Sequence, residues 1–349
     1  MRLFFESGEY DLETQGEIPL GSQALETIGI VRSWESQTQV YTINTSGTTG
    51  EYKSIELDRD LMEWSARQTA AACRLGSDEK EFCCLPINKV GGMMQIIRAL
   101  VFDRPLFVVD PLADPMIKLD SDHDYTLTSL TPYQFYHIFQ SDESLNKLSK
   151  FKVVLIGGGP VSVDLEEKIK SFEKWVETRF YHTYGMTETA SHIALRPIEN
   201  QDPENSFHAL PGVKISKAED DCLIIDIPQL ERSIETHDMI QLNRHGFSFI
   251  GRKDNIINSG GLKIIPERIE RNLEKALFQM GLNIPLYLRG DPDEALGQKC
   301  VLVIEEKNKS HSDVLQKLIR ETIESYQRPK EIRYLKHFKY TRTNKIIRQ

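Results

Sequence analysis

Six consecutive residues near the N-terminus carry either a hydroxyl group or no side chain, and a lysine follows shortly after them. They are TSGTTG (45–50), followed by Lys53. Glycine lets a backbone approach a ligand closely, and successive N–H groups with Ser and Thr hydroxyls form a concave anion site. The pattern GxxxxGK[ST] is absent because Tyr52 precedes the lysine. The stretch therefore predicts a phosphate-binding loop of another kind, and an ordinary polar turn is the alternative.

Length and composition are those of a globular chain with two domains. The chain has 349 residues, of which 40% are hydrophobic and 27% charged. The start, MRLFFESGEYDLE, lacks the apolar core of a signal peptide, and no apolar run reaches membrane-spanning length. Five scattered cysteines without a CxxC pair predict reduced thiols rather than disulfides or zinc ligands. We therefore expect a cytoplasmic protein without a membrane span.

Charge is distributed unevenly along the chain. The net charge of −9 argues against general binding of nucleic acids. Residues from 254 onward nevertheless carry +5, whereas residues 1–253 carry −14. A basic C-terminal part can close over phosphate groups as a lid. An ordinary solvated face is the alternative, and charge alone favours it.

Buried strands and helices alternate through the first half of the chain. Strands are predicted at 82–87, 105–110, 125–130, 152–157 and 178–185, and helices at 58–75, 93–102, 132–139 and 163–175. This alternation predicts an α/β domain with a mostly parallel sheet and helices on both faces. Ligands of such sheets bind beyond the carboxyl ends of the strands. GGGPVS (157–162) and YGMTET (184–189) follow two strands there; the first departs from GxGxxG and fits either a tight turn or contact with a base.

The pattern changes after residue 212. Short strands, GVKIS, DCLIIDI and FSFIG, are separated by polar turns and predict a small antiparallel module. GRKDN (251–255) has the composition of a junction, and the helices and strands beyond it predict a small α+β domain. The expected organisation is a large α/β domain over residues 1–253 and a C-terminal α+β domain over residues 254–349.

Four segments in one order resemble the adenylate-forming family, which contains acyl-CoA synthetases, luciferases and carrier-loading adenylation domains. They are TSGTTGEYK (45–53), YGMTET (184–189), Asp238 ahead of GRKDNIINSGGLKIIPERIE (251–270), and TRTNK (341–345). The resemblance covers nearly the whole chain from Asn44. It implies an AMP-binding domain, truncated at its start relative to the family, and a mobile C-terminal lid. It also implies ATP, Mg²⁺ and CoA as ligands of a two-step ligase.

The resemblance further implies roles for individual residues. The phosphates of ATP would lie against Thr45, Ser46, Gly47, Thr48, Thr49, Gly50 and Lys53; the adenine against Gly158, Gly159, Pro160, Tyr184 and Gly185; and the ribose on Asp238 and Arg252, with Lys263 also contacting the nucleotide. Thr187 would contact the α-phosphate and Glu188 the magnesium ion. Lys345 would bridge the attacking carboxylate and the α-phosphate. Asp254 would be the hinge of the lid, and Ser259, Gly260 and Gly261 would line the pantetheine tunnel.

The chain also departs from the family pattern at several positions. Tyr52 replaces a proline, His182 an asparagine, Lys89 a histidine and Asn344 a glycine. The short start, with YGMTETASHIA and GGGPVS, resembles most the o-succinylbenzoate–CoA ligases of menaquinone biosynthesis. Lys89 in LPINKVGG could pair with a carboxylate of such a dicarboxylic acid, or lie exposed at a loop edge. Thr189, Ser191 and His192 are further candidates for the acyl pocket.

Two other functions compete with this interpretation. One is an adenylation enzyme for a different aryl or acyl acid, and the other is a nucleotide-binding regulator without catalysis. Retention of Glu188, Asp238, Arg252 and Lys345 argues against the regulator. The expected partners are a small carboxylic acid, ATP and CoA, with no nucleic acid and with a homodimer as the default assembly.

Overall fold

The computed structural model describes residues 2–11, 22–46, 52–172, 177–199, 206–306, 310–340 and 346–348. The chain divides into two compact units. The first contains residues 1–160, 170–214 and 226–233, and the second contains 161–169, 215–225 and 234–349. The boundary between residues 253 and 254 that we expect from the sequence stays a prediction.

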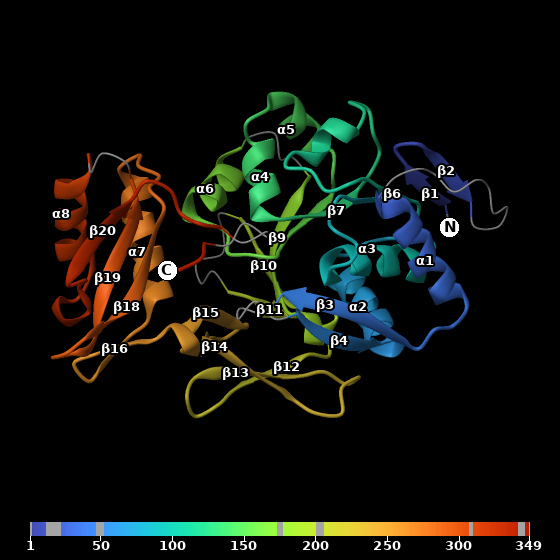
Figure 1. Cartoon of the computed structure of the whole chain (residues 1–349). Coiled ribbons are helices and arrows are strands. Elements are labelled where there is room, and N and C mark those ends of the chain that lie inside the picture. Colours follow the sequence, from blue (N-terminus) through green and yellow to red (C-terminus); the bar gives the residue numbers. More distant parts are fainter. Residues whose placement is uncertain are drawn as a thin grey trace. The chain divides into compact units, whose positions relative to one another are not determined.

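A nine-stranded sheet forms the first unit (Figure 1). Its order is β11-β10-β9-β8-β7-β5-β6-β1-β2. The strands from β9 to β1 are parallel, and β2, β10 and β11 add antiparallel edges. Their bounds are β1 (Arg2–Phe5), β2 (Gly8–Asp11), β5 (Glu81–Cys83), β6 (Leu106–Val108), β7 (Leu127–Leu130), β8 (Val153–Ile156), β9 (Arg179–Gly185), β10 (His192–Pro197) and β11 (His208–Ala209).

Helices and 3-10 turns alternate with strands along this part of the chain. The helices are α1 (Ser22–Glu35), α2 (Arg59–Ala72), α3 (Val90–Val101), α4 (Pro132–Ile138), α5 (Asp142–Leu148) and α6 (Val163–Ser171), with 3-10 turns η1 (Pro115–Lys118) and η2 (Thr187–Thr189). α3 leads from β5 to β6, whereas α4 and α5 lead from β7 to β8 in the opposite direction along the sheet. Right-handed crossovers place such connections on opposite faces. α1 packs with α3 against β1, β5 and β6 through residues such as Ile28, Val31 and Ile96.

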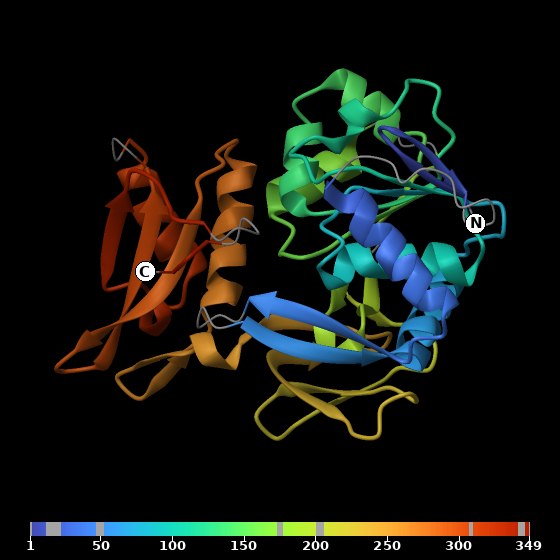
Figure 2. The same cartoon turned by 45° about the vertical axis from the view of Figure 1, so that its right-hand side comes forward.

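A separate antiparallel hairpin carries the phosphate-loop segment. β3 (Val40–Ser46) pairs with β4 (Tyr52–Asp58), and Ser46 lies opposite Tyr52. Residues 47–51, which lie between these two in the sequence, are outside the described residues. Figure 2 shows the two long strands of the hairpin side by side.

Two smaller sheets follow. The antiparallel module has the order β12-β13-β14-β15, with β12 (Lys214–Lys217), β13 (Cys222–Asp226), β14 (Ile234–Leu242) and β15 (Phe247–Arg252). The C-terminal sheet has the order β17-β16-β19-β18, with β20 paired to β19. Its elements are η3 (Lys253–Asn255), β16 (Ile257–Ser259), β17 (Leu262–Ile264), α7 (Pro266–Gln279), β18 (Leu286–Asp293), β19 (Gly297–Glu305), α8 (Ser312–Thr322), η4 (Ser325–Gln327) and β20 (Glu331–Leu335).

The C-terminal sheet has its own hydrophobic core. Buried residues from α7, α8, β18 and β19 meet there, among them Leu273, Leu288, Leu302 and Leu315. The fold class that we expect from the sequence is confirmed: a largely parallel α/β sheet, an antiparallel module and a C-terminal α+β part. Sequence patterns missed the hairpins β1–β2, β3–β4 and β16–β17, helices α1 and α5, and strands β10, β11 and β14.

Candidate active site

The predicted phosphate loop begins in β3 and continues beyond it in the sequence, and only part of it is described. Gly47, Thr48, Thr49 and Gly50 lie outside the described residues, whereas Thr45 belongs to β3 opposite Lys53 in β4. The ammonium group of Lys89 donates a hydrogen bond to the backbone oxygen of Asn44 at 2.9 Å. The side-chain oxygen of Asn44 accepts one from the Ser54 hydroxyl at 2.8 Å. Lys89 therefore holds β3 immediately before the loop.

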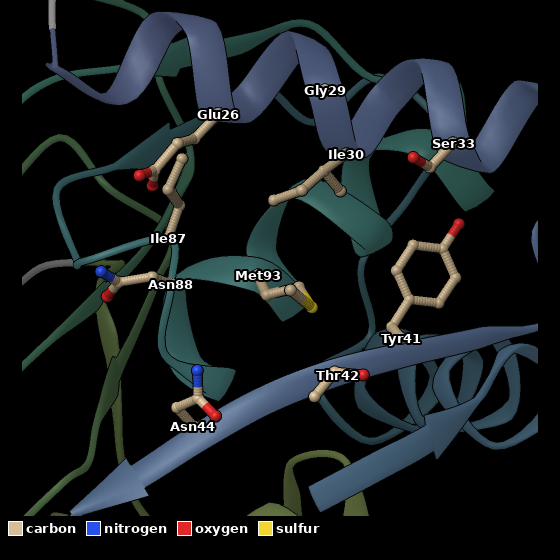
Figure 3. Close-up of a pocket in the computed structure, with 10 residues that line it drawn as sticks. All are labelled: Glu26, Gly29, Ile30, Ser33, Tyr41, Thr42, Asn44, Ile87, Asn88 and Met93. Atoms are coloured by element: carbon tan, nitrogen blue, oxygen red, sulfur yellow. The ribbon is translucent and has the colours of Figure 1, made fainter. Parts of the chain in front are cut away.

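A groove of about 340 Å³ lies beside this contact, between α1, β3 and the start of α3 (Figure 3). Asn44 and Asn88 line it, beside buried apolar side chains such as Met93. Lys89 thus follows one lining residue in the chain and is hydrogen-bonded to another.

The segment after β8 provides an open backbone surface. A Cβ atom at Gly157 would lie 2.4 Å from the Thr183 hydroxyl oxygen, so close packing against β9 requires glycine there. Gly158 has a φ of +81°, a conformation that favours glycine. At Gly159, by contrast, a Cβ atom would meet nothing within 4 Å. Packing within the described chain does not require glycine at 159, which leaves room for a ligand beside Pro160.

An aromatic cluster lies next to this segment. Phe207 lies 5.6 Å from Tyr184 and 5.1 Å from His182, measured between ring centroids. The His182 Nδ1 atom accepts a hydrogen bond from Arg196 at 3.0 Å, and Nε2 therefore donates to the backbone oxygen of Gly159 at 3.3 Å. This pair of contacts corresponds to a neutral imidazole. Tyr184 belongs to the YGMTET motif, whereas Phe207 and Arg196 lie outside the recognised motifs and were not predicted.

The turn after β9 presents two of the predicted residues. Thr187 and Glu188 are partly exposed on η2, whereas Thr189 is fully buried. The Thr189 hydroxyl donates to the backbone oxygen of Ser191 at 2.6 Å and accepts from the Met186 N–H at 3.2 Å. Thr189 therefore closes the turn that presents Thr187 and Glu188.

Gly185 and His192 lie opposite each other at the start of this turn. A Cβ atom at Gly185 would lie 2.3 Å from the Ser191 backbone oxygen, so the turn excludes any larger residue there. The Thr69 hydroxyl donates to the Ser65 backbone and therefore accepts from His192 Nε2 at 3.1 Å. The Ser191 hydroxyl lies 3.1 Å from Nδ1. Burial, together with the charge of a nearby arginine, lowers the pKa of His192 to about 3, so the ring is neutral at pH 7.

The second group of candidate residues lies where β14 and β15 end. Their register places Asp238 opposite Arg252. The guanidinium group of Arg252 contacts Asp238 at 3.2 Å and Asp254 at 2.9 Å. His237 lies 2.7 Å from the other oxygen of Asp254. The hydrogen bond from Arg252 lowers the pKa of Asp254. Strand pairing thus assembles two predicted ribose residues and the predicted hinge residue, and His237 is an addition that no motif indicated.

The hairpin β16–β17 contains the predicted tunnel residues. Gly260 and Gly261 have φ angles of +59° and +81°, the pattern of a two-residue turn that glycines favour. Ser259 is buried at the end of β16, and Lys263 lies exposed on β17 opposite Asn258. The turn explains both glycines, and their role toward a ligand stays a prediction.

Lys345 lies outside the described residues, and its flanks are held in place. Tyr340 and Ile346 form an isolated antiparallel bridge. The guanidinium group of Arg348 donates to Glu270 at 2.8 Å and to the Leu288 backbone oxygen at 3.2 Å. Residues on both sides of the predicted catalytic segment are thereby fastened to the C-terminal sheet.

Comparison with known proteins identifies the family. A model described as AMP-binding enzyme matches residues 12–231. The chain belongs to this family. It is 23% identical over 331 residues to the 2-succinylbenzoate–CoA ligase of Oceanobacillus iheyensis, an alignment that covers 87% of the chain and 67% of that protein. The chain thus spans about two thirds of the length of this relative.

Solved structures agree with this assignment. An acyl-CoA synthetase (AMP-forming)/AMP-acid ligase II-like protein from Dyadobacter fermentans is 30% identical, with a TM-score of 0.66 and coverage of 95% of this chain and 94% of the other. The o-succinylbenzoate–CoA synthetase of Bacillus subtilis in complex with ATP and magnesium has a TM-score of 0.71 at 20% identity, over 87% and 68% of the two chains. Family and relatives together support an AMP-forming acid–CoA ligase as the general class.

Three further features concern the described residues alone. None of their helices is long and apolar enough to span a membrane. They contain no group of three or more His, Cys, Asp or Glu side chains arranged to hold a metal ion. All five cysteines are buried, unpaired thiols.

Proposed function

We propose that the protein is an ATP-dependent o-succinylbenzoate–CoA ligase that acts in menaquinone biosynthesis. In the first half-reaction a carboxylate oxygen attacks the α-phosphorus of ATP and pyrophosphate leaves. In the second, the thiol sulfur of CoA attacks the acyl carbon and AMP leaves. The observation that carries the proposal is the match to relatives named 2-succinylbenzoate–CoA ligase, which extends over 85–90% of the chain. These alignments therefore also cover most of the residues outside 12–231, the range that the AMP-binding family model matches.

Each part of the nucleotide would have its own set of residues. The loop of residues 45–50 and Lys53 would bind the phosphates through N–H groups, hydroxyls and one ammonium. The open space at Gly159, where a Cβ atom would meet nothing within 4 Å, and the aromatic ring of Tyr184 would suit a flat adenine. Asp238, oriented by Arg252, would accept hydrogen bonds from the ribose hydroxyls.

Glu188 would hold magnesium together with the phosphates of ATP. Magnesium commonly takes one or two carboxylates and completes its shell with phosphate oxygens and water, so a single partly exposed glutamate fits the ion. When bound, the ion neutralises part of the triphosphate charge. Two residues of this chain would act on the α-phosphate itself. Thr187 would contact it, and Lys345 would stabilise the charge that develops on it.

The C-terminal part would serve both half-reactions by rotating about Asp254. Lys345 would face the α-phosphate in the first orientation. In the second, Ser259, Gly260 and Gly261 would line the path of the pantetheine arm, and Lys263 would contact the nucleotide. The contacts of Asp254 with Arg252 and His237 support a hinge next to the proposed ribose residues.

A different acid is the second candidate, and the contact of Lys89 favours it. If Lys89 paired with a carboxylate of the substrate, its ammonium group should be available to that carboxylate. The ammonium group of Lys89 instead donates a hydrogen bond to the Asn44 backbone oxygen at 2.9 Å. An acid without a second carboxylate would leave this contact in place.

The test is ATP-dependent release of pyrophosphate with o-succinylbenzoate, benzoate, acetate and a medium-chain fatty acid, each with and without CoA. Selective release with o-succinylbenzoate, together with its CoA thioester by mass spectrometry, is the expected result. Release with another acid alone would replace the substrate and keep the reaction. An enzyme that binds ATP by calorimetry and is silent with every acid would contradict the proposal and favour the regulator.

A further inference from the structure

The guanidinium group of Arg348 joins the end of the chain to two elements of the C-terminal part. Its Nη2 atom donates to Glu270 of α7 at 2.8 Å, and its Nη1 atom donates to the backbone oxygen of Leu288 in β18 at 3.2 Å. Glu267, one helical turn before Glu270, lies 3.9 Å from the same guanidinium group. The side chain of Arg348 is 29% exposed and that of Glu270 is 11% exposed. Arg348 therefore makes a charge-assisted contact that is largely shielded from water.

The two residues that precede this arginine are also held in place. The Ile347 N–H donates to the Lys339 backbone oxygen at 2.8 Å. Ile346 bridges to Tyr340 and packs against a small hydrophobic cluster of the C-terminal sheet. Tyr340 and Ile346 flank the segment that contains Lys345, and their pairing brings both flanks to one place on the C-terminal part.

Helix α7 connects this anchor with the proposed hinge. Glu267 in its first turn accepts a hydrogen bond from Asn255 at 2.5 Å. Asn255 directly follows Asp254 in the chain. The helix that binds Arg348 is thus also bound to the first residue beyond the proposed hinge. A rotation about Asp254 that carries α7 would carry the end of the chain with it.

Building on the ligase function proposed above, we propose that Arg348 is a positioning residue for the first half-reaction. It anchors the end of the chain to α7 and β18, so that Lys345, three residues earlier, reaches the α-phosphate from a fixed backbone. A lysine side chain is long and flexible, and ordering it costs less when its backbone is already held. Arginine suits this anchor because its planar group presents donors to two acceptors at once, whereas an ammonium group is a single point charge.

The experiment compares the two half-reactions in the full chain at pH 8, above the pKa of about 7 that burial gives to Glu270. Pyrophosphate release with the acid that the wild type activates measures the first, and thioester formation from pre-made acyl-adenylate and CoA measures the second. Arg348→Met keeps a side chain of similar length without its charge. It should lower kcat of pyrophosphate release about 10- to 100-fold, the effect of a misplaced catalytic group. KM for ATP and the rate of the second half-reaction should stay within about twofold of the wild type.

Two further variants separate positioning from stability. Arg348→Lys retains the positive charge but reaches one acceptor instead of two, so it should recover part of the lost rate. Arg333→Met is the matched control, because Arg333 of β20 also pairs with two carboxylates, Asp291 at 2.9 Å and Glu331 at 2.7 Å, and its side chain is 34% exposed. The control should leave both half-reactions within about twofold of the wild type. Thermal unfolding midpoints establish which variants are folded.

Three results would overturn the role of Arg348 and leave the proposed function intact. They are unchanged pyrophosphate release in folded Arg348→Met, an equal loss of both half-reactions in that variant, and an equal loss of pyrophosphate release in Arg333→Met. If Arg348→Met does not fold, Arg348→Lys decides: a selectively slower first half-reaction supports the positioning role, and the wild-type rate contradicts it. A wild type that releases pyrophosphate with no acid would overturn the proposed function and the positioning role together.

Discussion

Glu270 in α7 is predicted to make the C-terminal sheet less stable as pH rises from about 4.5 to about 7. Its carboxylate accepts hydrogen bonds from the Leu288 N–H at 2.6 Å and from Arg348 at 2.8 Å. Burial nevertheless dominates and raises the pKa of Glu270 from 4.5 to about 7. The negative charge of Glu267 also raises this pKa, whereas the positive charge of Arg348 lowers it.

The sign and size of the effect follow from proton linkage. Between pH 4.5 and 7 the folded state binds more protons at Glu270 than the unfolded state, so stability falls as pH rises. Above pH 7 both states are ionised and the loss is complete. A shift from 4.5 to about 7 corresponds to about 3 kcal/mol at 1.36 kcal/mol per pH unit. Glu274, whose pKa is also raised by burial, adds a smaller effect of the same sign.

Amide hydrogen exchange of peptides from α7 and β18 measures this directly, between about pH 5 and pH 8 and after correction for intrinsic exchange rates. The opening free energy of the wild type should fall by about 2 to 3 kcal/mol over this range. Glu270→Gln should lose most of this slope. Glu294→Gln, at an exposed position in the turn between β18 and β19, should retain it. The reasoning would be refuted if the opening free energy of the wild type stayed constant or rose with pH. It would also be refuted if this free energy fell equally steeply with pH in Glu270→Gln.

Four further predictions concern the first unit and the reaction. Acid should destabilise β10, because the pKa of His192 is lowered to about 3 and only the unfolded chain takes up a proton there as pH falls below about 6.5. Amide hydrogen exchange in β10 peptides should show this loss of stability, and His192→Gln should abolish the loss. Asp238→Asn should weaken ATP binding at least tenfold by calorimetry with the fold retained, and unchanged affinity would reject its ribose role. Lys345→Ala should abolish pyrophosphate release while leaving thioester formation from pre-made acyl-adenylate intact; equal loss of both half-reactions would contradict the assignment. Asp254→Pro should impair thioester formation selectively, because proline restricts backbone rotation, and an unimpaired second half-reaction would exclude the hinge.

Much of the fold was predictable where local patterns are strong. The apolar run VVLI of β8 is completely buried, and the amphipathic α7 begins at a proline that favours a first helical turn. The hairpin β3–β4 was missed because its strands, VYTINTS and YKSIELD, are rich in polar residues and its loop carries the motif itself. β10 was missed because it follows the motif residues without a turn signal, and its pairing with β9 contains an irregular register.

The sequence by itself determined the chemistry of the candidate site and the order of its parts. The Ser/Thr/Gly loop, the acidic residues and the terminal lysine are properties of residue type and spacing. Tertiary structure alone decided which polar groups are available to a ligand. It paired Arg252 with Asp238 and Asp254, and it committed Thr189 and His192 to internal hydrogen bonds. The physical reason is that a buried polar group is satisfied by neighbours distant in the chain, which strand register and packing select and local sequence does not encode.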